Sequence, residues 1–236
     1  MSTQALFPSL VPAQSALDFP VSLTEKYRPQ RIADFVGLNT PKAVLGNLAR
    51  HPRDGGAWLL SGPSGTGKTS MALALAAEMP AELHHVPSQN CNLETINSVW
   101  ARCHYVPMAG YRRHLILIDE ADRMSAAAQI ALLSKLDSTD CAPDTVVLLT
   151  CNVIAGLEPR FLSRCRSIEF SSYGIASEVA VFLARVWKTE TDDAPNAPHF
   201  ARLVKESNNN IRAALMSLEL KIMARDSLPL EVSAAA

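Results

Sequence analysis

The feature that most constrains this chain is an eight-residue segment, GPSGTGKT at positions 62–69, which matches the pattern G-x-x-x-x-G-K-[ST] without deviation. An apolar run at 57–60 precedes it, and an almost wholly apolar helical stretch, Ser70 to Met79, follows it. In such a loop the glycines let backbone N–H groups turn inward around phosphate oxygens, and the helix adds the positive end of its dipole. Glycine-rich turns without a ligand are the alternative, but the motif requires the flanking strand and helix that this chain provides.

The loop therefore predicts a site for the phosphates of ATP. Lys68 is expected to reach the β- and γ-phosphates, and the Thr69 hydroxyl is expected to hold Mg²⁺. The residues expected to contact the nucleotide here are Gly62, Pro63, Ser64, Gly65, Thr66, Gly67, Lys68, Thr69 and Ser70.

Two carboxylates follow a second apolar run. His114 to Ile118 reads as a buried strand, and Asp119 and Glu120 come directly after it. A carboxylate at the carboxyl end of such a strand can reach Mg²⁺ beside the phosphates, which is the role expected of Asp119. Glu120 can act as a general base on the attacking water. The alternative is an ordinary acidic pair at a strand end. The metal-binding interpretation is favoured because Asp119 and Lys68 follow strands that could be neighbours.

Three further side chains are candidates only in the company of this loop. Asn152, just past the run at 145–150, could bind a γ-phosphate or orient water, although asparagine is common where strands end. Arg164 precedes the last expected strand, and Arg212 opens the last expected helix. Each arginine alone would be a solvated charge; beside a phosphate site, both are candidates for stabilising transition-state charge.

Strand-like and helical segments alternate along the first two thirds of the chain, which predicts an α/β fold with a five-stranded parallel sheet flanked by helices. Ser125 is the expected N-cap of a helix over 126–136. After Phe170 the pattern changes to three helices. The expected organisation is a flexible tail over 1–22, a P-loop domain over 23–170, a small helical domain over 171–226 and a C-terminal tail over 227–236. The expected strands are 57–60, 83–86, 114–118, 145–149 and 167–170, and the three late helices are 175–187, 199–206 and 210–223.

Charge and composition exclude several classes. The formal net charge is −1, so the protein does not coat nucleic acid by bulk charge, and any such binding requires a local patch. No apolar run approaches the ~20 residues that cross a bilayer, and the N-terminus lacks the pattern of a secretory signal. The 5 cysteines include no C-x-x-C pair, which favours reduced thiols in a cytoplasmic protein over a disulfide framework or a zinc site.

Together these motifs resemble those of AAA+ ATPases, and specifically clamp-loader subunits of the replication factor C small-subunit and bacterial gamma/tau type. The resemblance runs from about Thr24 to Met223. The motifs that carry it are EKYRP at 25–29, FVG at 35–37, GPSGTGKT at 62–69, LILIDEADRM at 115–124, TCN at 150–152, SRC at 163–165 and NNIR at 209–212.

The resemblance implies a role for each remaining candidate residue. Asn152 would be sensor 1, and Arg164 would be an arginine finger that acts on ATP held by the neighbouring subunit of a ring. Arg212 would be sensor 2, which moves the helical lid onto its own subunit's nucleotide. The implied machine uses ATP and Mg²⁺ to open a ring-shaped sliding clamp and place it on primed DNA. The adenine pocket would be lined by Val36 and Gly37, with Tyr27, Arg28 and Pro29 nearby.

The sequence also departs from the family pattern. Asn209 stands where the sensor 2 motif usually begins with glycine, and asparagine is the next most tolerant residue at positive φ. The segment 88–92 replaces an acidic, arginine-bearing stretch, and 131–135 lacks paired arginines. Candidate DNA phosphate contacts are therefore single basic residues, Lys135, Arg112 and Arg113, although lone basic residues more often belong to a solvated surface. A clamp loader's collar domain is not expected after Asp226, so a ring would form through the ATPase domains.

Several alternatives stay open at this point. The chain could serve another AAA+ task, such as helicase loading or regulation of a mobile element, or it could be a non-hydrolysing structural subunit of a loader. A protein remodeller would require an aromatic pore loop, for which 105–108 is a poor candidate. In the N-terminal tail, Gln4 to Phe7 resembles a shortened clamp-binding peptide; an incidental apolar pair in an ordinary tail is the more frequent explanation.

Overall fold

The structure is a computed structural model that describes residues 21–51, 56–137, 142–191 and 193–226. The expected tails, and with them the Gln4 to Phe7 segment, lie outside these residues apart from positions 21 and 22 of the first. Within them, five parallel strands form one sheet in the order β2-β3-β4-β1-β5, which confirms the predicted α/β fold. The strands are β1 (Gly56–Ser61), β2 (Ala81–Pro87), β3 (Arg113–Asp119), β4 (Thr145–Cys151) and β5 (Cys165–Glu169).

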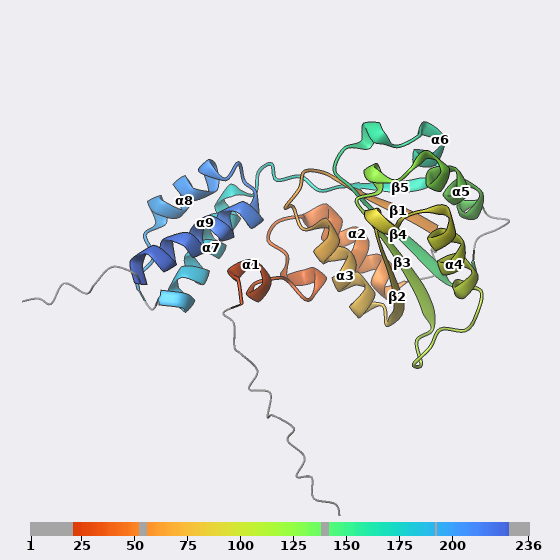
Figure 1. The fold of residues 1–236 in the computed structure, drawn as a ribbon. Helices are drawn as coiled ribbons and strands as arrows, with labels where there is room; N and C mark the ends of the chain where they lie inside the picture. The colour runs from red at the N-terminus through yellow and green to blue at the C-terminus, as the bar shows by residue number, and fades with distance from the viewer. Residues whose placement is uncertain (1–20, 52–55, 138–141, 192, 227–236) are drawn as a thin grey trace, which may run out of the picture.

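Helices cover both faces of the sheet (Figure 1). Successive residues of a strand point to opposite faces, so Leu115 and Leu117 pack into one core with α2 and α3, while Ile116 and Ile118 pack into the other with α4 and α5. Burial on both faces explains why the inner strands β1, β3 and β4 read as continuous apolar runs rather than as alternating ones. These helices are α2 (Asn39–Arg50), α3 (Lys68–Glu78), α4 (Leu93–Cys103), α5 (Ala126–Leu136) and the short α6 (Pro159–Leu162).

The helical part that follows the sheet has its own core. Helices α7 (Ala176–Thr191), α8 (Ala197–Glu206) and α9 (Ile211–Asp226) pack around Val179, Phe200 and Leu218. The short N-terminal helix α1 (Leu23–Lys26) joins this cluster through Leu23, although it precedes the sheet in sequence. Figure 1 shows α1 beside α9 and between the two parts of the protein.

Local signals account for several helix boundaries. The Ser125 hydroxyl accepts a hydrogen bond from the backbone N–H of Ala128 at 3.2 Å, which confirms the predicted N-cap of α5. Helix α8 begins at Ala197, two residues earlier than expected, because Pro198 fits the first helical turn, where its missing N–H costs nothing. None of the helices in the described part of the chain has the length and apolarity needed to cross a lipid bilayer.

Candidate nucleotide-binding site

The glycine-rich loop joins the end of β1 to the start of α3, as its motif requires. Gly62, Gly65 and Gly67 have φ values of 146°, 78° and 93°, in the left-handed region that favours glycine. A Cβ on Gly62 would lie 2.1 Å from the Phe170 carbonyl oxygen, and one on Gly65 would lie 2.2 Å from the Asn210 side chain. The loop backbone is therefore packed too closely for side chains at these positions.

Lys68 is the most enclosed charged group of the loop. It is only 6% exposed, and its ammonium donates hydrogen bonds to the carbonyl oxygens of Gly62 and Pro63 at 2.7 and 2.8 Å and to Asn152 Oδ1 at 2.9 Å. Burial lowers the pKa of Lys68 from its usual value, and the positive charge of Arg212 acts in the same direction. All three donors of the ammonium thus have acceptors within the site.

The predicted metal-binding pair lies together. The Thr69 hydroxyl donates to Asp119 Oδ1 at 2.7 Å, and the Thr150 hydroxyl donates to the same oxygen at 2.5 Å. Contrary to the expectation, the strands that precede Lys68 and Asp119 are not neighbours, because β4 lies between β1 and β3. Residues at the carboxyl end of β4 connect the two instead. Thr150 donates to Asp119, and Asn152, which follows β4, accepts from Lys68.

Thr150 also holds the backbone of Glu120, the predicted general base. Its hydroxyl oxygen accepts a hydrogen bond from the Glu120 N–H at 2.9 Å, and Glu120 has φ 53°, which is uncommon for a residue with a side chain. The Glu120 carboxylate is 41% exposed and lies 3.3 Å from Arg123 Nε. Asn152 is held on the adjoining turn, because its N–H donates to Asp122 Oδ1 at 3.2 Å.

A cavity of about 910 Å³ continues from the loop into the space between the sheet and the helical part. Its wall includes Arg212, residues between positions 24 and 30, and the segment 35–37. A Cβ on Gly37 would lie 2.4 Å from Ile175, so the two parts approach closely there. Of the residues predicted to bind nucleotide or sense it, those in the wall are Tyr27, Arg28, Pro29, Val36, Gly37, Gly65, Thr66, Gly67, Ser70 and Arg212.

The start of α9 contacts the phosphate loop directly. Asn209 has φ 58°, as predicted for the residue that replaces glycine there. Asn210 accepts a hydrogen bond from the Ala213 N–H at 3.1 Å and donates to the Ser64 carbonyl oxygen at 2.8 Å. The helix that carries Arg212 is thereby tied to the loop that would hold the phosphates.

Arg164 lies away from these groups. It precedes β5, whose first residue pairs with Ala57 of β1, whereas the phosphate loop follows Ser61. At ~3.3 Å per residue, the length of β1 separates them by roughly 16 Å. Arg164 instead pairs with Asp137 at 2.6 and 3.3 Å, and this pairing lowers the pKa of Asp137.

The residues that are brought together fit a nucleotide and a divalent cation. The loop is a backbone cradle that a Cβ would fill at two positions, and a hydroxyl and a carboxylate, the oxygen donors that Mg²⁺ prefers, meet beside it. Sequence reasoning missed Thr150 and Asn210. Both residues lie in motifs that carry the family resemblance, TCN at 150–152 and NNIR at 209–212, but neither of them was given a role from the sequence.

Comparison with known proteins relates this arrangement to one family and one fold. Residues 58–173 match the model of the ATPase family associated with various cellular activities, AAA. Replication factor C subunit 4 of Oryza sativa subsp. japonica is 32% identical over 164 residues, covering 65% of this chain and 47% of that protein. The replication factor C small subunit of Halobacterium salinarum is 28% identical over 215 residues, covering 86% and 64%. The chain thus spans between about half and two thirds of these relatives.

Solved structures show the same fold at low sequence identity. The Thermotoga maritima RuvB Holliday junction branch migration motor superposes with a TM-score of 0.67 over 84% of this chain and 72% of that chain, at 20% identity. A single-substitution variant of RuvB from the same organism gives a TM-score of 0.68 at 19% identity, with the same coverage. At this identity the likeness describes the fold alone.

Proposed function

We propose that this chain, which carries an AAA-family domain and resembles replication factor C small subunits, is a Mg²⁺-dependent ATPase that works in an oligomer to load or remodel a DNA replication component. The observation that carries the proposal is the contact of Thr69 with Asp119 beside the buried Lys68. Such a constellation binds the phosphates and the metal of a nucleoside triphosphate, and the adjoining cavity has room for the nucleoside.

Within this proposal Lys68 changes partners when phosphates arrive. Its ammonium has three donors, and all three are used by Gly62, Pro63 and Asn152. Contact with phosphate oxygens therefore requires that at least one of these bonds be exchanged. Release of the Asn152 amide would free it to orient water or a phosphate, which gives the sensor 1 role a physical basis in this chain.

Glu120 is the proposed general base. Thr150 holds its backbone N–H, and the half-exposed carboxylate lies next in sequence to Asp119, the proposed metal ligand. Mg²⁺, when bound, neutralises charge on the phosphates. Thr69 and Asp119 hold that ion, the loop N–H groups and Lys68 bind phosphate oxygens, and Glu120 accepts the proton of the attacking water.

Arg212 is proposed to report the nucleotide to the helical part. It lines the cavity with the loop, and its helix is already tied to Ser64 through Asn210. A phosphate charge on the loop attracts the guanidinium, so the relative position of α9 and the sheet depends on what is bound.

Arg164 is proposed to complete the site of a neighbouring subunit. Its distance from its own loop leaves it unable to stabilise charge there, and its partner Asp137 is a surface carboxylate that an incoming γ-phosphate would replace.

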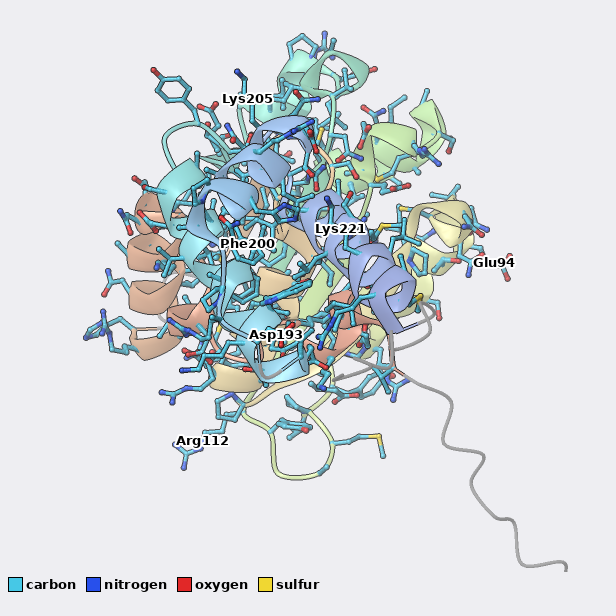
Figure 2. The ribbon with its side chains drawn as sticks, turned by 90° about the vertical axis from the view of Figure 1, so that its left-hand side faces the viewer. Glu94, Arg112, Asp193, Phe200, Lys205 and Lys221 are labelled. Carbon is cyan, nitrogen blue, oxygen red and sulfur yellow. The ribbon has the colours of Figure 1, made fainter. Side chains whose placement is uncertain are left out.

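The proposed client and the proposed binding of DNA rest only on the resemblance to replication factor C small subunits. Of the candidate DNA contacts, Arg113 pairs with Asp144 and Lys135 lies over the Trp100 ring, while Arg112 points away from the body of the protein (Figure 2).

The test is steady-state ATP hydrolysis per subunit as the protein concentration rises, with and without primed DNA, beside Glu120→Gln as the matched control. The proposal expects a specific rate that rises with concentration and again with DNA, and a control that binds ATP without turning it over. A low rate that is unchanged by concentration and by DNA would identify a structural subunit that needs another chain for catalysis, and would contradict the proposal.

A further inference from the structure

A second cluster of metal-ligating side chains lies on the edge strand β2 and near the amino end of β3, away from the phosphate loop. His84 on β2, His114 at the start of β3 and Cys103 at the end of α4 are 9%, 2% and 1% exposed. One donor atom from each lies within 4.8 Å of the others. The site proposed for ATP uses none of these residues.

The hydrogen bonds of His114 leave its inner nitrogen free of a proton. Its Nε2–H donates to the Tyr105 carbonyl oxygen at 2.8 Å, so Nδ1 carries the lone pair and accepts a hydrogen bond from the His84 Nε2–H at 2.9 Å. A histidine that binds a metal usually donates its other ring N–H to a carbonyl or a carboxylate in this way. A cation bound between the two rings would replace the hydrogen bond between them and release the His84 proton.

Glu82 lies beside the two imidazoles, next to the group of three, and is the candidate for a fourth donor. Its carboxylate oxygens lie 4.0 Å from His84 Nε2 and 3.8 Å from His114 Nδ1, and donors around a tetrahedral zinc ion stand ~3.3 Å apart. Glu82 pairs with His114 across β2 and β3, so the sheet fixes their register. The same carboxylate also pairs with Arg102 at 3.3 Å, which holds it at the cluster.

We propose that Glu82, His84, Cys103 and His114 form a structural binding site for Zn²⁺ or a cation of similar softness. Two imidazoles, one thiolate and one carboxylate are a donor set that suits zinc, and Mg²⁺ would not be retained by it. His114 stands five residues before Asp119 on the same strand, roughly 16 Å away at ~3.3 Å per residue, so the ion has no part in phosphate chemistry.

The position of the site indicates what the ion would hold in place. The segment between α4 and β3 exposes Tyr105, Val106 and Met108, which are 75%, 87% and 64% exposed. Two of its backbone groups rest on the cluster, because the Tyr105 carbonyl oxygen accepts from His114 and the Met108 N–H donates to Glu82 at 2.7 Å. An ion that fixes His114 and Glu82 therefore fixes the base of this apolar segment.

Cobalt substitution tests the site on the full chain. Co²⁺ is titrated into chelator-treated protein at neutral pH, and the visible and near-ultraviolet spectra are recorded. The proposal expects one equivalent per chain, with the strong visible bands of a tetrahedral ion and a thiolate-to-cobalt charge-transfer band that Zn²⁺ removes and excess Mg²⁺ does not. An octahedral, thiolate-free spectrum, or no binding, overturns it.

Two pairs of variants assign the ligands. His84→Gln and Cys103→Ser are each expected to weaken Co²⁺ binding by more than the ~10–100-fold that follows loss of a hydrogen-bond partner of a ligand. Cys103→Ser is also expected to remove the charge-transfer band. The matched controls are His85→Gln, the exposed next residue of β2, and Cys91→Ser, a buried thiol of the same core. Both controls keep the site. Equal effects in ligand and control variants, with circular dichroism showing all four folded, would refute the assignment.

Discussion

Thr150 is the residue through which the two predicted carboxylates are positioned. It is 1% exposed, donates to Asp119 and accepts from the Glu120 N–H. Thr150→Val keeps the shape of the side chain but removes both bonds. We expect the ATP hydrolysis rate to fall about 10–100-fold, the usual effect of removing a hydrogen-bond partner of a metal ligand, with a smaller change in nucleotide affinity. A fluorescent ATP analogue and a phosphate-release assay measure the two quantities.

Thr145→Val is the control for this change, since Thr145 is equally buried at the other end of β4 and its hydroxyl donates to the Pro143 carbonyl oxygen. It should leave hydrolysis unchanged. If Thr145→Val and Thr150→Val slowed hydrolysis equally, the effect would lie in the stability of β4 and not in the carboxylates.

Substitutions at Glu120 and Lys68 are expected to distinguish ATP hydrolysis from nucleotide binding. Glu120→Gln retains size and polarity but cannot accept a proton, so we expect nucleotide binding to persist, the assembled state to accumulate, and turnover to fall by about 10²–10⁴. Lys68→Ala removes the buried ammonium and should abolish nucleotide binding. Equilibrium binding and single-turnover hydrolysis distinguish them; hydrolysis by Glu120→Gln at the parent rate would show that another group is the base.

The sequence predicted the local part of this site but not its cross-connections. The P-loop and Asp119 belong to patterns in which spacing along the chain carries the geometry, and Thr69 does contact Asp119. Thr150 and Asn210 act through contacts with residues 31 and 146 positions away. The motifs TCN and NNIR contain these residues but do not say what they contact, because the contacts depend on which strands and helices lie side by side.

At the scale of elements, the phosphate loop runs close to the end of β5, where Gly62 has no room for a side chain. A Cβ on Gly62 would meet the backbone oxygen of Phe170, which cannot rotate away, and its φ of 146° is itself unfavourable for other residues. We expect Gly62→Ala to lower the free energy of unfolding by about 1–3 kcal/mol, the range for backbone strain of this kind. Thermal and denaturant unfolding followed by circular dichroism measure it.

Gly46→Ala is the matched substitution in the middle of α2. A Cβ there meets nothing within 4 Å, and alanine favours the helix, so we expect stabilisation of about 0.4–1 kcal/mol. Destabilisation by both changes, or by neither, would contradict the assigned packing of the loop.

The elements themselves were predicted better than their arrangement. Each expected strand falls on an observed one and overruns it by a single residue at most. The inner strands β1, β3 and β4 are buried on both faces and read as continuous apolar runs, whereas the edge strands β2 and β5 are partly exposed. The order of the strands could not be predicted, because periodicity records burial and not neighbours, and the expectation that the strands before Lys68 and Asp119 adjoin was therefore wrong. Packing of α1 against α9 was equally invisible to local patterns.

At the scale of the whole molecule, the parallel sheet separates two kinds of group. The phosphate loop, Asp119 and Asn152 follow the carboxyl ends of strands, whereas Arg164 precedes the amino end of β5. Because the five strands of the described residues are parallel, Arg164 and the phosphate loop lie at opposite ends of the strands. No movement of one side chain brings Arg164 to the loop of its own chain. A role for Arg164 in hydrolysis therefore requires a second copy or a related subunit.

Mixing two inactive variants tests this requirement. Arg164→Ala keeps an intact phosphate loop but donates no guanidinium, and Lys68→Ala has a defective loop but keeps Arg164. If Arg164 acts across an interface of a homo-oligomeric ring, Lys68→Ala subunits supply it to Arg164→Ala neighbours. Random assembly at equal amounts should then restore about a quarter of the wild-type hydrolysis rate per chain, since half the chains have a working loop and half of those a working neighbour.

The control is each variant alone at the same total concentration, which should remain near background because every site in such a ring lacks either its lysine or its arginine. Glu120→Gln in place of Lys68→Ala repeats the test with a partner that still binds ATP, and should restore activity to the same extent. A mixture no more active than the sum of its parts would mean that Arg164 does not act between copies of this chain, and that its proposed partner site belongs to a different subunit.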